Sequence, residues 1–219
     1  MGEMPSLPAP SQPRMAGEDR RRQLIEVAID LFSRKGFAGT TTKEIAAAAG
    51  ITEAMIFRHF ATKQELYKAI LDYKCGGENI PDWLAQAQSF MENSDDEGLF
   101  RFLLSSIIRM HREHPEFERL LIHAALEGHE LAIMHNDQMA TSVGAQFNDY
   151  IARRQREGAI RECDPSIVLF SVVGLPRFYA LKKYIHHRGL PFEDEQVVET
   201  MLSILMNGLR TREHEGKSR

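Results

Sequence analysis

Apolar residues recur along most of this chain at intervals of three and four positions, which is the spacing of one face of an α-helix. The first such run contains Leu24, Val27, Ala28, Leu31 and Phe32. No stretch shows the strict alternation of apolar and polar residues that is typical of a half-buried strand. The pattern therefore predicts an all-α protein with about nine or ten helices.

Capping signals divide the next part of the chain into short helices. Thr41 stands three positions before Glu44, and Thr62 stands three positions before Glu65, which is the capping-box spacing. Gly50 follows the first of these helices, where a sharp turn requires a positive φ. The predicted helices cover residues 41–49, 53–60 and 62–74.

The two helices predicted over residues 41–49 and 53–60 have the features of a helix-turn-helix. Ala46 is small where two helices cross closely, Ile51 fills the turn, and Ile56 and Phe60 bury the second helix. Such a pair is rigid enough to place the N-terminal residues of its second helix in a DNA major groove. The alternative is two ordinary short helices in an all-α protein.

The rest of the chain continues with longer helices. Ser94 and Glu97 have capping-box spacing, and Pro115 suits the first position of a helix. Asp164 and the following proline open a strongly apolar helix. The predicted helices cover residues 82–91, 94–111, 115–128, 139–158, 164–187 and 193–212.

Composition excludes several classes of protein. The formal net charge is −4, from 27 Lys and Arg against 31 Asp and Glu, and only two cysteines are present, without the spacing of a disulfide framework or a zinc site. The N-terminal residues lack a long apolar segment, so we expect a cytoplasmic protein with no membrane span. We find no nucleophile or nucleotide-binding motif, and we expect neither enzymatic activity nor a cofactor.

Histidines offer one further chemistry. His111 and His114 lie three positions apart, but no further ligand follows at a spacing typical of a metal site. A metal-sensing protein would require His111, His114 or His123 to converge in space. We therefore predict that no metal is bound.

Residues 18–66 resemble the DNA-binding domain of the TetR/AcrR family of bacterial transcriptional regulators. The segments that carry the resemblance are LFSRKGF, GTTTKEIAAAAGIT and MIFRHFATKQELY. Two positions depart from the family pattern: Ala54 stands where glycine is usual, and Phe57 stands where tyrosine is frequent. Phe57 has no hydroxyl group to donate to a phosphate, so only its ring can pack on the DNA backbone.

The helix positions and the resemblance together give candidate DNA contacts. The resemblance implies that Lys63 clamps a phosphate, and Thr41 and Thr42 lie at a helix N-terminus that suits one. Glu53 either accepts from a cytosine amino group or is a solvated acid at a helix start. The candidate DNA-binding residues are Thr41, Thr42, Thr52, Glu53, Ala54, Met55, Phe57, Arg58, His59 and Lys63.

The charge divides unevenly along the chain. Residues 18–74 contain 10 basic and 8 acidic residues, whereas residues 75–219 contain 16 and 22. A slightly basic DNA-binding end therefore precedes an acidic body. The predicted organisation is a disordered N-terminal tail over 1–17, a helix-turn-helix domain over 18–62, a helical ligand-binding and dimerisation domain over 63–213, and a flexible C-terminus over 214–219.

The resemblance implies a homodimer formed through the last two helices and a ligand pocket in the body. Residues 167–181 are apolar nearly all round, which suits a dimer surface or, alternatively, an internal core helix. His123 and Glu127 share one helix face and either meet a polar ligand group or form a surface pair. The candidate ligand-binding residues, for each of which core packing is the alternative, are Phe102, Met110, His123, Glu127, Phe147, Phe170, Arg177 and Phe178.

The sequence thus predicts a DNA-binding transcriptional regulator. By the habit of the family it is a repressor that a small, largely apolar effector releases from a palindromic double-stranded operator. The alternative is a DNA-binding adaptor whose C-terminal domain contacts a protein partner and binds no small molecule. A closed cavity near Phe178 would favour the effector, and a sealed core would favour the adaptor.

Overall fold

The computed structural model describes residues 17–75, 79–139 and 144–210. The predicted N-terminal tail, apart from Gly17, and the predicted flexible C-terminus lie outside the described residues.

The described residues form eleven α-helices and one π-helical turn, and an isolated bridge between Ile160 and Arg210 is their only β-type pairing. The all-α prediction is confirmed. The helices are α1 (Gly17–Lys35), α2 (Thr42–Ala48), α3 (Glu53–His59), α4 (Lys63–Cys75), α5 (Asn79–Glu92), α6 (Asp96–Glu113), α7 (Pro115–Leu126), α8 (Glu130–Met139), α9 (Ala145–Arg156), α10 (Pro165–Ala180) and α11 (Asp194–Leu209), with the π-helical turn over Leu181–Ile185.

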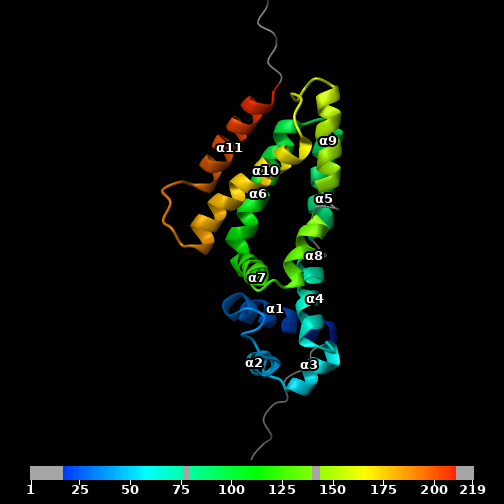
Figure 1. Ribbon diagram of the computed structural model, residues 1–219, viewed down its shortest axis with the longest axis vertical. Helices are drawn as coiled ribbons and strands as arrows, with labels where there is room; N and C mark the ends of the chain where they lie inside the picture. Colours follow the sequence, from blue (N-terminus) through cyan, green and yellow to red (C-terminus); the bar gives the residue numbers. More distant parts are fainter. Residues whose placement is uncertain (1–16, 76–78, 140–143, 211–219) are drawn as a thin grey trace, which may run out of the picture.

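The molecule is elongated, and α1, α2 and α3 form a small head at one end (Figure 1). Helix α4 leads from the head into the body. There α6, α10 and α11 lie on one side and α5, α8 and α9 on the other, while α7 crosses the end of the body next to α1.

The first hydrophobic core joins the head to the body. It contains buried residues of α1 to α4, and also Phe117, Leu120, Leu121 and Ala124 of α7. Burial of apolar surface is the main force that holds helices together. The core therefore does not divide at residue 62, because α4 and α7 belong to it as much as the head does.

The second core fills the distal part of the body. It is built by α5, α6, α9, α10 and α11, with Phe100, Leu104, Ile151 and Val172 fully buried. Helix α10 contributes one side only to this core.

The start of α6 differs from the sequence prediction. The capping box predicted for Ser94 and Glu97 is wrong: Ser94 has a φ of 54° and lies before the helix. Asp95 is the N-cap residue instead, and its carboxylate accepts from the Gly98 N–H at 2.9 Å. An Asp directly after a Ser gave the sequence two candidates for the same cap.

No helix was predicted over most of α8, and the helix predicted over residues 139–158 corresponds to α9. Helix α8 begins at Glu130, and α9 begins at Ala145. The apolar helix from Pro165 also ends earlier than predicted, at Ala180, and continues as the π-helical turn. Periodicity alone does not reveal the change to a π-helical turn, because the residues on either side keep a helical spacing.

Candidate DNA-binding site and effector region

The two helices of the head are held in a fixed geometry by caps and by one glycine. The Thr41 hydroxyl accepts from the Glu44 N–H, and the Glu44 carboxylate accepts from the Thr41 N–H, so the predicted capping box is present. Gly50 has a φ of 67°, as the sharp turn requires. The Ile51 N–H then donates to the Ala46 carbonyl across the turn at 3.0 Å.

Helix α3 buries one face and leaves the other in solvent. Ile56 is fully buried against α1 and α2, and Phe60 closes the end of the helix. Thr52, Glu53, Ala54, Phe57 and Arg58 are exposed, and Met55 and His59 are partly exposed. The predicted contact residues of α3 are thus together on the surface of the head.

Two of the candidate residues contact each other. The Thr42 hydroxyl donates to the Glu53 carboxylate and so ties the N-terminus of α2 to that of α3. This contact orients the Glu53 side chain along the surface.

An ion pair that the sequence did not single out holds α1 against α2. Lys35 Nζ lies 2.7 Å from Glu44 Oε1. The hydrogen bond from Lys35, followed by those from Thr41, lowers the pKa of Glu44 to about 2. Glu44 therefore stays ionised, keeps its contact with the Thr41 N–H, and has a clear role in fixing α2.

Lys63 points toward the body and not away from the head. Its Nζ donates to the Phe37 carbonyl at 2.5 Å and lies 4.1 Å from the centroid of the Phe37 ring. Burial lowers the pKa of Lys63, while the nearby Glu127 raises it. The phosphate contact implied by the resemblance would require a different position of this side chain.

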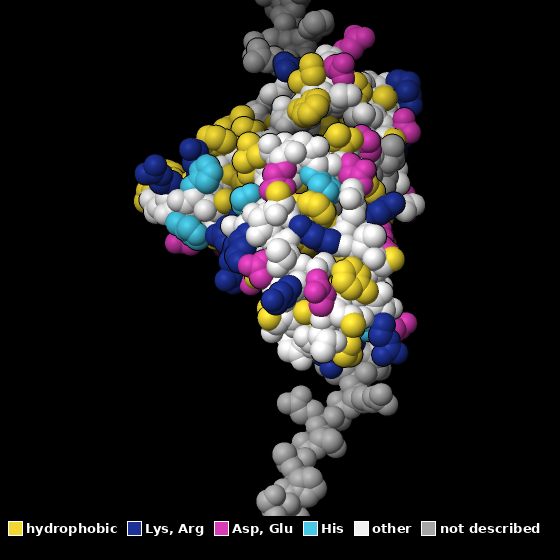
Figure 2. Space-filling model, turned by 60° about the horizontal axis from the view of Figure 1, so that its bottom comes forward, with side chains coloured by type: hydrophobic (Ala, Val, Ile, Leu, Met, Phe, Trp, Pro, Cys, Tyr) yellow, Lys and Arg dark blue, Asp and Glu magenta, His cyan; other side chains and the backbone are white. Residues whose placement is uncertain are grey.

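Lys and Arg side chains alternate with Asp and Glu on the surface turned forward in Figure 2, where the bottom of the molecule has been brought toward the viewer. Within the head, Lys35 is paired with Glu44 and Arg34 with Asp30. Such pairing neutralises part of the positive charge of the head, in keeping with the small excess of basic residues in residues 18–74.

The structure does not bring the eight candidate ligand-binding residues together. Phe147 is buried in the distal core, and Phe102 packs on Trp83 with ring centroids 5.5 Å apart. Phe170 and Phe178, by contrast, are 77% and 65% exposed on the outer face of α10. Met110 is also exposed.

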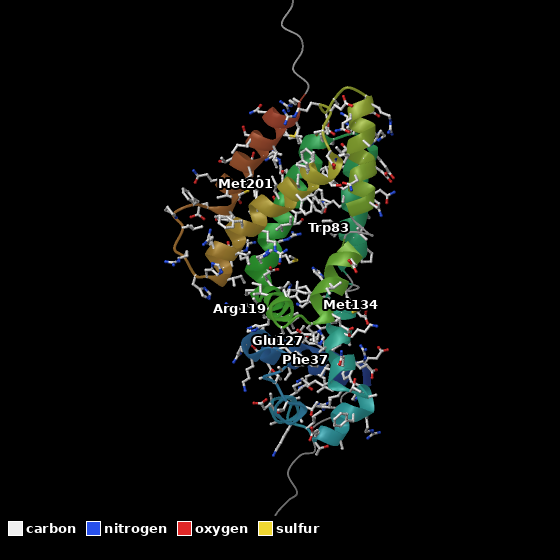
Figure 3. All side chains as sticks on the ribbon, viewed as in Figure 1. Phe37, Trp83, Arg119, Glu127, Met134 and Met201 are labelled. Carbon is white, nitrogen blue, oxygen red and sulfur yellow. The ribbon has the colours of Figure 1, made fainter. Side chains whose placement is uncertain are left out.

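The remaining three candidates take part in contacts between helices. Arg177 donates through Nε and Nη2 to Oε1 of the buried Glu118, at 3.1 and 2.5 Å. His123 and Glu127 lie at the junction with the head, next to Gly36. In Figure 3, Glu127 and Phe37 are seen close together where α7 meets α1.

A small apolar cavity lies between α5, α6 and α9. It has a volume of about 20 Å³ and is lined by Trp83, Leu103 and Phe147 among others. A larger, open pocket of about 550 Å³ lies at the far end of the body, next to Asp96 and Arg210. Phe178 lines neither, and of the eight candidates only Phe147 reaches the apolar cavity.

Comparison with known proteins agrees with this architecture. The family model of bacterial regulatory proteins of the tetR family matches residues 24–70. The transcriptional regulator RutR of Escherichia coli is 25% identical over 202 residues, covering 88% of this chain and 92% of RutR. The transcriptional regulator TtgR of Pseudomonas putida is 30% identical over 154 residues, covering 69% of this chain and 64% of TtgR.

The chain belongs to the TetR family. A solved structure agrees in fold: NalD, the secondary repressor of the MexAB-OprM multidrug efflux pump in Pseudomonas aeruginosa, matches with a TM-score of 0.66 and 20% identity. The match covers 88% of this chain and 98% of NalD. Like its TetR-family relatives, the chain is a helix-turn-helix transcriptional regulator that binds DNA, and this family is not one of enzymes.

The body of this protein carries an apolar surface on its last two long helices, α10 and α11. Ile167, Phe170 and Phe178 of α10 and Ile204 of α11 are all more than 60% exposed. Side chains of this size and number are rarely left in water by a monomer. TetR-family regulators dimerise.

The histidines considered for metal binding have separate partners. The His111 ring nitrogen Nδ1 lies 2.8 Å from the Ile107 carbonyl, whereas His114 faces Glu116. Among the residues that the structure describes, no three His, Cys, Asp or Glu side chains are grouped to hold a metal ion. Within the same residues, every helix is too short or too polar to cross a membrane.

Proposed function

We propose that this regulator is a homodimeric repressor, and that a small, largely apolar effector bound in the body releases it from a near-palindromic operator. One observation carries the proposal: the exposed face of α3 lies at one end of a molecule whose α10 and α11 expose an unpartnered apolar surface. A two-fold pair through that surface presents two copies of α3, as a palindromic site requires.

The roles on the DNA follow from the exposed positions of the head. Residues at the start of α3 read base edges, and residues at the start of α2 and the end of α3 contact phosphates. Base contacts are proposed for Thr52, Glu53, Ala54 and Met55, and phosphate contacts for Thr41, Thr42, Phe57, Arg58 and His59. A protein that acts on the chromosome in this way works in the cytoplasm.

The dimer surface has a direct test. Phe170→Glu places a charge at the most exposed side chain of the apolar face. We expect a monomer by light scattering, together with loss of the specific band in a gel shift with the upstream DNA of its own gene. Ile133→Glu on α8 is the matched control, because Ile133 is also well exposed, at 62% against 77% for Phe170, but lies on another helix. A Phe170→Glu protein that remains dimeric would refute this surface, and a wild-type protein without a specific band would refute operator binding.

The apolar cavity is the proposed entry point of the effector. A volume of about 20 Å³ holds no more than a water molecule, so the effector has to widen it. Trp83 is the only tryptophan of the chain, so its fluorescence reports on this cavity. We expect the apolar probe N-phenyl-1-naphthylamine to quench Trp83 by energy transfer, and Ala87→Val, which narrows the cavity, to weaken this effect.

The adaptor without a small ligand is not favoured, because RutR, which matches almost the whole chain, is itself a transcriptional regulator. A probe that leaves Trp83 fluorescence unchanged, together with a protein partner bound at the body, would favour it instead.

A further inference from the structure

Both backbone polar groups of Phe37, in the loop after α1, are bound by charged side chains from other helices. Glu127, at the end of α7, accepts from the Phe37 N–H at 3.1 Å through Oε2. Lys63, at the start of α4, donates to the Phe37 carbonyl at 2.5 Å. We call Phe37, Lys63 and Glu127 the Phe37 junction.

The approach of Glu127 to the head depends on a glycine. Gly36 has a φ of 72°, and a Cβ atom at this position would lie 2.0 Å from Glu127 Oε1 and 3.5 Å from His123 Nδ1. The carboxylate therefore packs directly on the Gly36 backbone. His123 and Glu127, which the sequence suggested for a ligand pocket, are seated on the DNA-binding head.

An aromatic cluster surrounds the junction and links the same three parts of the chain. The centroid of the Phe37 ring lies 4.9 Å from the ring centroid of Tyr67 in α4 and 4.6 Å from that of His129, which follows α7. Tyr67 and His129 are also 4.6 Å apart, edge to face. Contacts of this kind hold the loop, α4 and the end of α7 in one arrangement.

Lys63 cannot bind the Phe37 carbonyl and a DNA phosphate at the same time. Its ammonium group is held beneath Phe37 in this structure, yet a phosphate contact would require the same group on the outer surface of the head. The proposed repressor needs such contacts, because phosphate neutralisation supplies much of the affinity for DNA. The position of Lys63 therefore distinguishes a DNA-binding arrangement from the one seen here.

Helix α7 is fixed at both ends. Near its N-terminus, the buried Glu118 accepts from Arg177 of α10 and lies 3.5 Å from Nε2 of the buried His111 of α6. Near its C-terminus, Glu127 holds Phe37. The helix has twelve residues, about 18 Å at 1.5 Å per residue, so a shift of α6 or α10 reaches the head through one rigid element.

We propose that Glu127 is a positioning residue that holds Lys63 away from the DNA through Phe37, and that α7 transmits the state of the body to this junction. The proposal rests on the repressor function above and specifies its regulation. Loss of Glu127 removes one of the contacts that hold the loop, so Lys63 leaves Phe37 more readily and operator affinity rises. An effector lowers affinity by favouring the arrangement in which the junction is closed.

The test compares Glu127→Ala with Glu130→Ala in full-length protein, by fluorescence anisotropy on the operator at several salt concentrations. Glu130 is an exposed acid three residues away whose carboxylate accepts from Gln64, so the two variants change the net charge equally. We expect Glu127→Ala to bind about fivefold more tightly than Glu130→Ala. Its plot of log affinity against log salt should be steeper by about 1.8, from one new phosphate contact per protomer.

Adding Lys63→Met to Glu127→Ala should abolish both gains, because the freed cation is then absent. A purely structural role of Glu127 predicts weaker binding and an unchanged slope. Equal affinity and slope in the two single variants would overturn the Phe37 junction while leaving the repressor intact. Absence of specific binding in every protein, wild type included, would overturn the repressor and the junction together.

Discussion

Replacement of Gly36 by alanine separates two contributions that this glycine makes to stability. An alanine that adopts the positive φ of this position lowers the free energy of unfolding by about 1–2 kcal/mol. The added Cβ also displaces the Glu127 carboxylate, whose nearest oxygen would be 2.0 Å away. Glu127 is flexible and moves, but it then loses its hydrogen bond to the Phe37 N–H, worth about 1 kcal/mol. Gly36→Ala should therefore destabilise the protein by about 2–3 kcal/mol.

Gly50 provides the matched control. Its φ of 67° is nearly the same, and a Cβ atom there would meet nothing within 4 Å. Gly50→Ala should cost the backbone contribution alone, about 1–2 kcal/mol. With a urea m-value of about 2 kcal/mol/M, the extra 1 kcal/mol at Gly36 shifts the midpoint by about 0.5 M.

The assay is urea unfolding followed by circular dichroism at a fixed protein concentration, since dimerisation makes stability depend on concentration. In a Glu127→Ala background, Gly36→Ala should cost no more than Gly50→Ala. Equal midpoints for the two glycine variants in the wild-type background would refute the reasoning, because they would show that Glu127 contributes nothing at Gly36.

Three further expectations follow from the head. The pKa of Glu44 is lowered from 4.5 to about 2. The stability that ionised Glu44 contributes is therefore fully present above pH 4.5 and is lost as the pH falls through about 2. The difference in melting temperature between wild type and Glu44→Gln should shrink over that range. Arg58→Ala should weaken binding to all DNA sequences alike and reduce the salt slope by about 1.8 per dimer, whereas a loss confined to one operator position would contradict a phosphate contact. Ile56→Ala should cost about 2–5 kcal/mol by creating a cavity under α3, and an unchanged unfolding midpoint would show that Ile56 does not fix this helix.

Local signals predicted the head well because each depends on a few adjacent residues. Gly50, the Thr41 cap and the small Ala46 each specify a turn or a crossing within one stretch of chain. Pro115 likewise opens α7 as predicted. Residues whose role is local are therefore readable from the sequence alone.

Contacts between distant parts of the chain were not readable in the same way. Glu127 meets Phe37 across 90 positions, and no periodicity links the two. Lys63 could be placed at the start of a helix, but the direction of its side chain depends on Phe37 and Glu127. An apolar helix such as α10 looks the same in sequence whether its Phe170 faces a core or another protein, which is why exposure had to come from the structure.

The shared core of α1 to α4 and α7 sets a condition for exchanging heads between members of the family. A graft cut after α4 would separate Leu24 and Phe32 from Phe117 and Leu120, and both halves would expose apolar surface at the seam. A chimera that changes operator specificity should therefore carry α7 with the head, or match its apolar face residue by residue. The elements to be exchanged together, α1 to α4 and α7, are not continuous in sequence, although the resemblance to the family covers one continuous stretch, residues 18–66.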